Sequence, residues 1–349
     1  MRSATTRSRR SGTEVTPDLL SQLSERIVGQ PAALEAIVPY ILMHQAGLSP
    51  EGRPVGVFLL LGPTGTGKTR TVEALAEALH GSEKHVLRID CGEFQMEHEV
   101  AKLIGAPPGY LGHRETVPML NQQKLNAVTS ERSNLSIVLF DEIEKAAASL
   151  QRLLLGVLDK AVLRLGDNTT VNFERSLIFM TSNLGARGMS REMRPNFGFQ
   201  ALAGMPRQTV RRKLESIALT AVRKRFSPEF VNRIDVISTY YPLSQEALFQ
   251  ILDHQIEGLR RHISNRLGAR AFSFEVTESA RLFLLEQGAS AEYGAREMKR
   301  VVLRQLTQPL ASLVARGRVD AGASILIDHK PGDDQLSFMV QSGEEALAA

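Results

Sequence analysis

Short runs of apolar residues alternate with helical patterns along the first two thirds of the chain. The runs lie at residues 55–62, 86–90, 136–140, 176–181 and 235–240, and each has the length of a buried strand. The segments between them place apolar residues at helical spacing, as in RTVEALAEALHG. Strands that are buried on both faces and alternate with helices predict an α/β fold, with a parallel sheet flanked by helices.

The pattern changes near residue 242. Helical patterns dominate over 246–267, 279–287 and 296–315, and the stretch SILIDHKPGDDQLSFMV then predicts two strands around a turn. We therefore expect a large α/β domain over 17–241 and a smaller, mainly helical C-terminal domain with a short β-sheet over 242–341. Residues 1–16 are expected to form a disordered basic tail, and residues 342–349 a frayed end.

The stretch GPTGTGKT follows the first strand, begins an amphipathic helix and matches G-x-x-x-x-G-K-[ST] in full. Glycines let backbone N–H groups surround phosphates, and a helix N-terminus favours negative charge. Lys68 is expected to reach the β- and γ-phosphates of ATP, and Thr69 to ligate Mg²⁺. The predicted nucleotide-binding residues of this loop are Gly62, Pro63, Thr64, Gly65, Thr66, Gly67, Lys68 and Thr69.

An acidic pair follows the apolar run SIVLF, at the edge of the sheet where ligands bind in open parallel sheets. Asp141 is expected to hold Mg²⁺, directly or through water, and Glu142 to deprotonate the attacking water. Asn183 ends the next apolar run, where its amide can position that water. A base for water indicates a hydrolase, because a phosphoryl-transfer kinase acts on a bound acceptor instead.

Two weaker features accompany this pair. Glu144 is expected to cap the following helix and to take no part in the chemistry. The run VLRID lies between the phosphate loop and the acidic pair in the sequence. This extra strand indicates the additional-strand branch of P-loop enzymes.

The net positive charge of the chain equals the charge of its first ten residues. The chain has 42 basic and 38 acidic residues, and without the four arginines of this segment the two numbers are equal. A nucleic-acid partner is not expected, because such binders carry a basic face on the folded domain. The sequence shows no secretory leader, no 18-residue apolar stretch and a single cysteine, Cys91, so we expect a cytoplasmic protein without a membrane partner.

Eight motifs occur in one order along the chain: LSERIVGQPAALEAI, GPTGTGKT, RIDCGEF, LIGAPPGYLG, VLFDEIEKA, MTSNLG, FSPEFVNRID and YGAREMKR. Together they resemble the second ATPase module of ClpA, ClpB and ClpC, in the Clp family of AAA+ ATPases. The resemblance runs from about residue 17 to residue 340. It implies an ATP-hydrolysing homo-hexamer, a chaperone that unfolds polypeptide substrates by threading them through a central pore.

The resemblance also implies roles for residues outside the loop and the acidic pair. Ile27 and Val28 would flank the adenine. Arg233 would be the arginine finger that reaches the γ-phosphate of a neighbouring subunit. Arg296 would be the second sensor, carried by the small domain. Arginine suits both places because its planar fork clamps phosphate oxygens and stays charged.

Two further segments are assigned by the resemblance to polypeptide and protein partners. Tyr110 and Leu111, in GYLG, match the pore loop that grips substrate. The tripeptide Phe197-Gly198-Phe199 lies where ClpA and ClpC dock the ClpP-type peptidase, although an aliphatic residue is usual at its first position. The alternative for this tripeptide is a hydrophobic anchor within a loose loop.

Two competing functions remain open at this stage. The single ATPase module and the altered flank of the pore loop, HRETVPMLNQQ, favour a nucleotide-gated factor that remodels one dedicated protein complex without full threading. A nucleic-acid motor is disfavoured by the neutral body of the chain.

Overall fold

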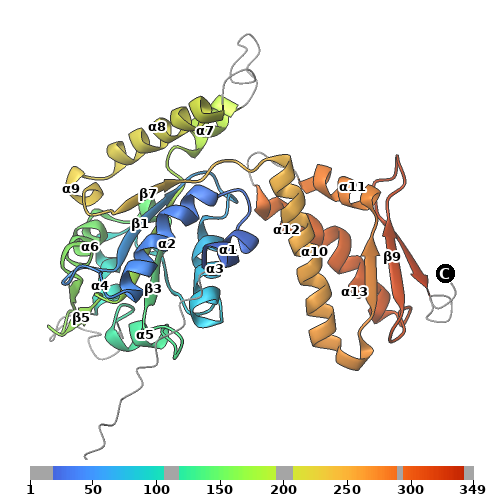
Figure 1. Ribbon diagram of the computed structural model, residues 1–349, viewed down its shortest axis with the longest axis horizontal. Coiled ribbons are helices and arrows are strands. Elements are labelled where there is room, and N and C mark those ends of the chain that lie inside the picture. Colours follow the sequence, from blue (N-terminus) through green and yellow to red (C-terminus); the bar gives the residue numbers. More distant parts are fainter. Residues whose placement is uncertain (1–18, 106–117, 194–206, 289–293, 342–349) are drawn as a thin grey trace, which may run out of the picture.

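The computed structural model describes residues 19–105, 118–193, 207–288 and 294–341. They form two parts that lie side by side in Figure 1, a parallel sheet covered by helices and a smaller helical part that ends in a short sheet. The predicted fold class, an AAA+ sheet with flanking helices and a second helical part, is confirmed.

The central sheet has five parallel strands in the order β2-β3-β6-β1-β7. The strands are β1 (Gly56–Leu61), β2 (Leu87–Asp90), β3 (Ser136–Asp141), β6 (Ser176–Ser182) and β7 (Val236–Thr239). Every residue of β1 and β6 is buried, as the continuous apolar runs predict. Because all five strands are parallel, their carboxyl ends meet at one edge of the sheet.

The strand that lies between β1 and β3 in the sheet is not the one that the sequence predicted. VLRID forms β2, which lies at the edge of the sheet, and the strand between β1 and β3 in space is β6. The branch of P-loop enzymes was predicted correctly, but through a strand that is adjacent in sequence and not in space. Chain order and sheet order differ here because each parallel connection crosses over a face of the sheet.

The two faces of the sheet carry separate hydrophobic cores because side chains alternate along each strand. In β1, Phe58 and Leu60 pack with α1–α3, whereas Val57, Leu59 and Leu61 pack on the opposite face. The helices of this part are α1 (Leu19–Arg26), α2 (Pro31–Gln45), α3 (Lys68–His80), α4 (Ala101–Ile104), α5 (Gln122–Ala127), α6 (Ala148–Lys160), α7 (Ala186–Met193), α8 (Arg207–Arg225) and α9 (Pro228–Val231).

Short elements lie between these helices and strands. A hairpin of β4 (Val162–Arg164) and β5 (Thr170–Asn172) follows α6 and was not predicted from the sequence. The short 3-10 turns are η1 (Cys91–Glu93), η2 (Glu97–Val100) and η3 (Ile143–Lys145).

The second part has its own core, formed between four helices and a three-stranded sheet of order β10-β9-β8. Its third strand, β8, was not predicted, and the expected helix over 296–315 is interrupted by a π-helical turn, η5. The elements are α10 (Gln245–Leu267), η4 (Gly268–Arg270), β8 (Ser273–Val276), α11 (Glu278–Gly288), α12 (Ala295–Val302), η5 (Leu303–Thr307), α13 (Gln308–Ala315), β9 (Ser324–Asp328) and β10 (Ser337–Gln341).

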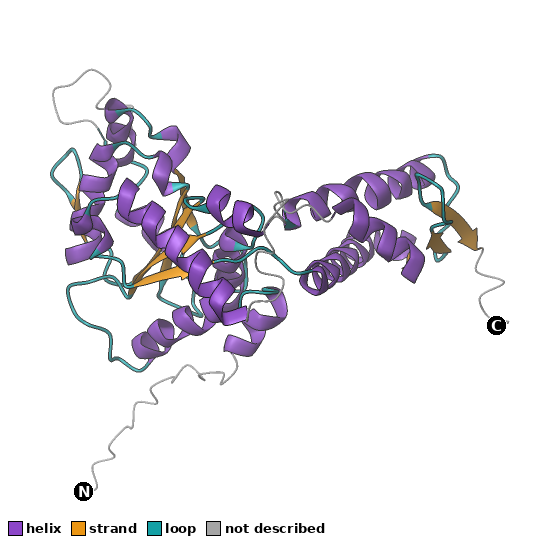
Figure 2. Ribbon diagram, turned by 90° about the horizontal axis from the view of Figure 1, so that it is seen from above, coloured by secondary structure: helices purple, strands orange, loops and turns teal. Residues whose placement is uncertain are grey.

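Figure 2, seen from above, shows the helices of the second part projecting from one side of the sheet-containing part. Within the described residues, no helix is both long enough and apolar enough to span a membrane.

Candidate nucleotide site

The phosphate loop joins β1 to α3 at the carboxyl edge of the sheet. Gly62 has φ +141°, and a Cβ on it would lie 2.3 Å from the carbonyl oxygen of Tyr240, so only glycine fits there. Gly67 adopts the left-handed conformation at the N-terminus of α3. Thr66 closes the loop from within, because its hydroxyl donates to the carbonyl oxygen of Pro63 at 2.9 Å.

Lys68 is the first residue of α3, and only 8% of it is exposed. Its ammonium group donates to the carbonyl oxygens of Gly62 at 2.6 Å and Pro63 at 2.8 Å, and to Oδ1 of Asn183 at 3.0 Å. Burial lowers the pKa of Lys68 to about 8, and the charge of Arg296 lowers it further, although nearby carboxylates partly oppose the shift. The site therefore holds a desolvated cation, which an anionic ligand would stabilise.

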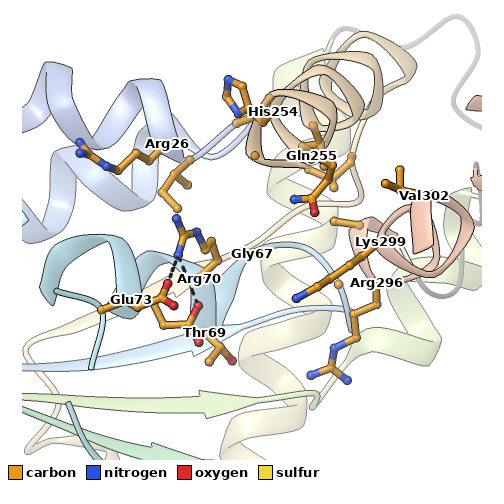
Figure 3. Close-up of a pocket in the computed structure, with 18 of the residues that line it drawn as sticks. Arg26, Gly67, Thr69, Arg70, Glu73, His254, Gln255, Arg296, Lys299 and Val302 are labelled. Carbon is orange, nitrogen blue, oxygen red and sulfur yellow. Dashed lines mark hydrogen bonds and ion pairs between the residues drawn. The ribbon is translucent and has the colours of Figure 1, made fainter. Parts of the chain in front are cut away.

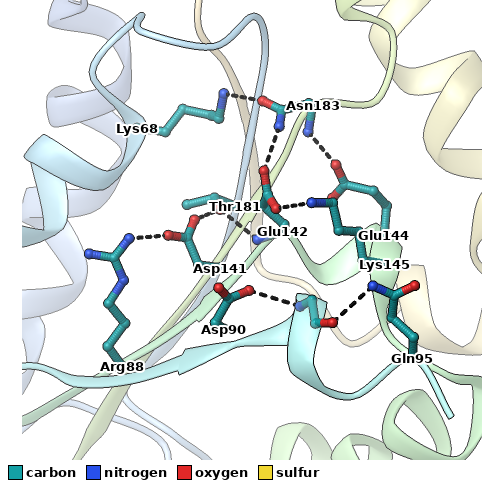
Figure 4. A network of polar contacts seen from close by, with 11 residues as sticks. Lys68, Arg88, Asp90, Gln95, Asp141, Glu142, Glu144, Lys145, Thr181 and Asn183 are labelled. Carbon is teal, nitrogen blue, oxygen red and sulfur yellow. Dashed lines mark hydrogen bonds and ion pairs between the residues drawn. The ribbon is translucent and has the colours of Figure 1, made fainter. Parts of the chain in front are cut away.

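Asp141 and Glu142 lie at the end of β3, with their side chains held by different partners (Figure 4). Arg88 pairs with one oxygen of Asp141, and the hydroxyl of Thr181 donates to the other. Glu142 has φ 56° and ψ 49°, the left-handed conformation that non-glycine residues rarely adopt. This bend at Glu142 directs the carboxylates of Asp141 and Glu142 to different hydrogen-bonding partners.

Glu142 and Lys68 are connected through the side chain of Asn183. Nδ2 of Asn183 donates to Oε1 of Glu142 at 3.3 Å, while its Oδ1 accepts from Lys68. Lys145 pairs with the other oxygen of Glu142 at 2.5 Å, and this hydrogen bond raises the pKa of Lys145. Lys68, Glu142 and Asn183, all predicted from the sequence, thus lie in one hydrogen-bonded cluster.

Glu144 does not cap the following helix, contrary to the sequence interpretation. It lies in η3, and its Oε1 accepts from the backbone N–H of Asn183 at 2.9 Å. Arg225, on α8, donates to the backbone carbonyl oxygens of Glu144 and Ala146. These contacts fix the acidic turn against β6 and α8, which no local pattern could reveal.

A cleft of about 1280 Å³ opens from the phosphate loop to the second part of the chain. Ile27 and Val28, which directly follow α1, line it. Arg296 lines it from α12, as Figure 3 shows. The backbone N–H of Ala295 donates to the carbonyl oxygen of Gly65 at 3.0 Å, so α12 contacts the phosphate loop directly. Of the predicted loop residues, those lining the cleft are Gly65, Thr66, Gly67, Lys68 and Thr69.

Gln30 is a buried residue of the site that the sequence analysis did not assign. Its Nε2 donates to the carbonyl oxygens of Thr66 at 3.2 Å and Tyr241 at 2.9 Å, and its Oε1 accepts from the N–H of Tyr241. One amide therefore ties the phosphate loop to the segment that leads into α10. Its only signal in the sequence was its place in the VGQ motif.

Arg233 lies apart from the cleft of its own chain. It follows α9, and its Nε is 2.9 Å from Oδ1 of Asp159 on α6, in an ion pair without hydrogen-bond alignment. Among the described residues that line the cleft, arginines come from α1, α3, α10 and α12, and Arg233 is absent. Tyr110, Leu111 and the tripeptide Phe197-Gly198-Phe199 lie outside the described residues.

The donor set fits a nucleotide with Mg²⁺. A buried ammonium group lies at a helix N-terminus beside a glycine loop. The carboxylate of Asp141 ends β3, directly before Glu142, which Asn183 connects to Lys68. Such a loop suits phosphate oxygens, and a carboxylate with a threonine hydroxyl suits a hard cation. The residues that would hold the metal are Thr69 and Asp141.

Comparison with known proteins agrees with this geometry. Residues 53–237, more than half of the chain, match the family described as AAA domain (Cdc48 subfamily), and residues 243–327 match the C-terminal, D2-small domain, of ClpB protein. The chaperone protein ClpB of Rhodopirellula baltica is 38% identical over 317 residues, which are 91% of this chain and 33% of that protein. The ClpC subunit of Staphylococcus aureus, an ATP-binding subunit of the Clp protease, is 34% identical over 92% of this chain and 37% of its own length.

Solved structures of Hsp104 have the same fold. A closed-state cryo-EM reconstruction of Hsp104 with ATPyS and FITC casein has a TM-score of 0.76 at 26% identity, over 93% of this chain and 51% of that one. The extended Saccharomyces cerevisiae Hsp104–casein complex has a TM-score of 0.78 at 25% identity, over 95% of this chain and 53% of that one. The chain thus spans about a third of the curated relatives and about half of these structures. It belongs to the AAA+ ATPases and is similar over most of its length to ClpB, ClpC and Hsp104.

Proposed function

We propose that this chain is the motor of an ATP-driven protein unfoldase that works as a homo-hexamer. The observation that carries the proposal is a pocket with a phosphate lysine, a strand-end acidic pair and a water-positioning asparagine, from which Arg233 of the same chain is held away. A hydrolytic pocket that needs an arginine from a neighbour is active only in a ring.

In this proposal Lys68 binds the β- and γ-phosphates, and Ile27 and Val28 contact the adenine. Thr69 and Asp141 would hold Mg²⁺, which would supply positive charge against the negative charge of the phosphates. In this proposal Arg296 contacts the same phosphates, which its position in the cleft and its influence on the pKa of Lys68 support. The small domain would thereby sense the nucleotide directly.

Glu142 is the general base of the proposed reaction. Its carboxylate takes a proton from water while an oxygen–phosphorus bond forms, and the bond to the β–γ bridging oxygen breaks so that ADP leaves with the electron pair. Asn183 aligns Glu142 with Lys68 through its two amide atoms. Lys145 pairs with one oxygen of this carboxylate and Asn183 with the other, and each oxygen keeps a second lone pair that can accept the proton.

Subunit mixing tests the shared pocket. Arg233→Ala subunits keep an intact phosphate loop, and Lys68→Ala subunits keep the arginine, so each alone should be nearly inactive. In randomly mixed rings about a quarter of the sites combine both intact parts, and ATP hydrolysis should return to that extent. Arg152→Ala, which changes an exposed arginine on α6, serves as the matched control. Absence of recovery in rings of confirmed mixed composition would reject catalysis across the interface.

The proposed substrate is polypeptide, gripped by Tyr110 and Leu111. An aromatic side chain can hold an unfolded chain by packing, without demanding a sequence. The relatives support this choice, since both Hsp104 structures contain casein. The proposal extends to delivery of substrate to a ClpP-type peptidase through Phe197-Gly198-Phe199, and a direct binding assay tests it.

Replacement of the pore tyrosine tests threading. Tyr110→Ala should leave basal ATP hydrolysis within about twofold of wild type and abolish unfolding of a tagged folded substrate, whereas Tyr110→Phe should retain unfolding. Equal unfolding by the alanine variant and the wild type would reject the role of this loop. A wild-type protein that unfolds no general substrate, yet acts on one co-purified complex, would favour the dedicated remodelling factor instead.

A further inference from the structure

The hydroxyl group of Thr181 lies between the two acidic residues of the site. Thr181 is the penultimate residue of β6, which pairs with β3 up to Phe140 opposite Met180. Its Oγ1 donates to Oδ1 of Asp141 and accepts from the backbone N–H of Glu142 at 3.0 Å. Thr181 is 1% exposed, so its hydroxyl is committed to these two residues and is shielded from solvent.

The contact with Glu142 has a specific structural consequence. Glu142 is in the left-handed conformation, which costs a non-glycine residue free energy and needs support from its surroundings. The pairing of β3 with β6 stops one residue before Asp141, and the N–H of Glu142 finds its acceptor in the Thr181 side chain. This hydrogen bond holds the bend that separates the carboxylate of Glu142 from that of Asp141.

The two oxygens of the Asp141 carboxylate have different partners. Thr181 holds Oδ1, whereas Arg88, on the edge strand β2, pairs with Oδ2, and 51% of the Arg88 side chain is exposed. A long, half-exposed arginine can move away at small cost, whereas a buried threonine with a short side chain cannot. A cation that approaches Asp141 can therefore replace Arg88 while Thr181 keeps the carboxylate in place.

We propose that Thr181 is a positioning residue of the ATPase site, which orients Asp141 for Mg²⁺ and fixes the turn of Glu142 through one hydroxyl group. The inference rests on the proposed roles of Asp141 and Glu142 and adds the residue that sets their geometry. Thr181 itself touches neither the nucleotide nor the metal in this assignment.

Three variants of the full chain test the inference. Thr181→Val keeps the shape of the side chain and removes both hydrogen bonds, Thr181→Ser keeps the hydroxyl, and Asp141→Asn tests the metal assignment itself. The affinity for the non-hydrolysable analogue AMP-PNP is measured with Mg²⁺ and with EDTA, and the ratio of the two is the benefit that the metal brings. Steady-state ATP hydrolysis and the thermal midpoint are measured on the same samples.

Thr181→Val is expected to lower the Mg²⁺ benefit about tenfold, because a hydrogen bond to a charged group is lost, while affinity in EDTA stays within about twofold. Its kcat should fall about a hundredfold, since the base is also released from its turn. Thr181→Ser should restore both quantities. If the valine variant does not fold, Thr181→Ala takes its place, with the same expectations.

Two results would overturn the inference. One is a wild-type Mg²⁺ benefit and kcat in the valine variant. The other is an equal loss of affinity with Mg²⁺ and with EDTA, which identifies Thr181 as a general structural residue. If Asp141→Asn keeps the full Mg²⁺ benefit, the metal assignment in the proposed function is wrong, and that failure is distinguishable because it does not involve Thr181.

Discussion

The two ends of the nucleotide cleft are built in different ways. At the phosphate end, Lys68, Glu142 and Asn183 belong to one domain and are joined by hydrogen bonds at the edge of a buried sheet. At the other end, α1 of the large domain and α10 and α12 of the small domain line the cleft together. The hydrogen bond from Ala295 to Gly65 joins the small domain to the loop.

This difference separates chemistry from affinity. The groups that would cleave ATP are prepositioned by strands that cannot shift without disrupting a core. Among the described residues, one backbone hydrogen bond joins the small domain to the loop, beside a wide cleft, so we expect this part to move more easily than the strand ends. Changes at Glu142 and Asn183 should therefore affect kcat, whereas changes at Lys68 or at the small-domain end should affect affinity.

The largest effect is expected at Glu142. Glu142→Gln should lower kcat by about 10² to 10⁴ because the general base is lost, with ATP affinity little changed. Phosphate release and binding of a fluorescent nucleotide measure the two quantities. Glu25→Gln, at an exposed residue that lines the other end of the cleft, is the matched control and should keep its kcat. Substantial turnover by the Glu142 variant would remove the base assignment.

The second effect is a loss of folding stability at low pH, which arises from His80 within the large domain. His80 ends α3, the helix that begins at the phosphate loop, and it is 6% exposed against the ring of His85. Burial lowers the pKa of His80 to about 4, and His85 lowers it further. The unfolded state, with a pKa of 6.5, then binds more protons, so this contribution to stability is complete above pH 6.5 and is lost as the pH falls toward 4.

The loss from His80 amounts to about 3 kcal/mol at most. Urea unfolding at pH 7.5, 5.5 and 4.5 measures it, and His80→Gln should flatten the dependence. The exposed His262 of α10 provides the control, since His262→Gln should keep the wild-type slope. An unchanged slope in the His80 variant would assign acid sensitivity to other groups.

The third effect is a pH dependence of nucleotide binding. Because burial lowers the pKa of Lys68 to about 8, the free protein loses this proton above pH 8, whereas a bound phosphate needs the ammonium form. ATP affinity should fall by about tenfold per pH unit above 8. Titrations between pH 7.5 and 9.5 measure the slope. Lys68→Arg stays charged, so weak binding with a flat profile is expected, and a steep profile in this variant would point to another group.

The smallest effect is expected at the contact between the domains. Gly294 has φ +49°, and a Cβ there would lie 2.8 Å from the carbonyl oxygen of Gly65. Gly294→Ala should push α12 away from the loop and weaken ATP binding about fivefold, with kcat at saturating ATP nearly unchanged. The control is Gly258→Ala, because Gly258 lines the same cleft and has open space around it. Equal effects of the two changes would show that the contact carries no affinity.

Much of the site was predictable because it is local in the sequence. The phosphate loop, Asp141, Glu142 and Asn183 each directly follow an apolar run, and parallel strands bring their ends together at one edge. The partners of these residues were not predictable. Thr181 and Gln30 lie 40 and 211 positions from the residues they contact, and only the order of the strands makes them neighbours.

The sequence by itself determined the class of fold and the class of ligand, because periodicity reports burial and a contiguous loop carries its own phosphate-binding geometry. The tertiary structure alone decided which strand lies between β1 and β3, which group holds Asp141, and that Arg233 pairs with Asp159 away from its own cleft. The physical reason is that crossover connections bring together residues that are far apart in the chain, and such contacts leave no periodic trace in the sequence.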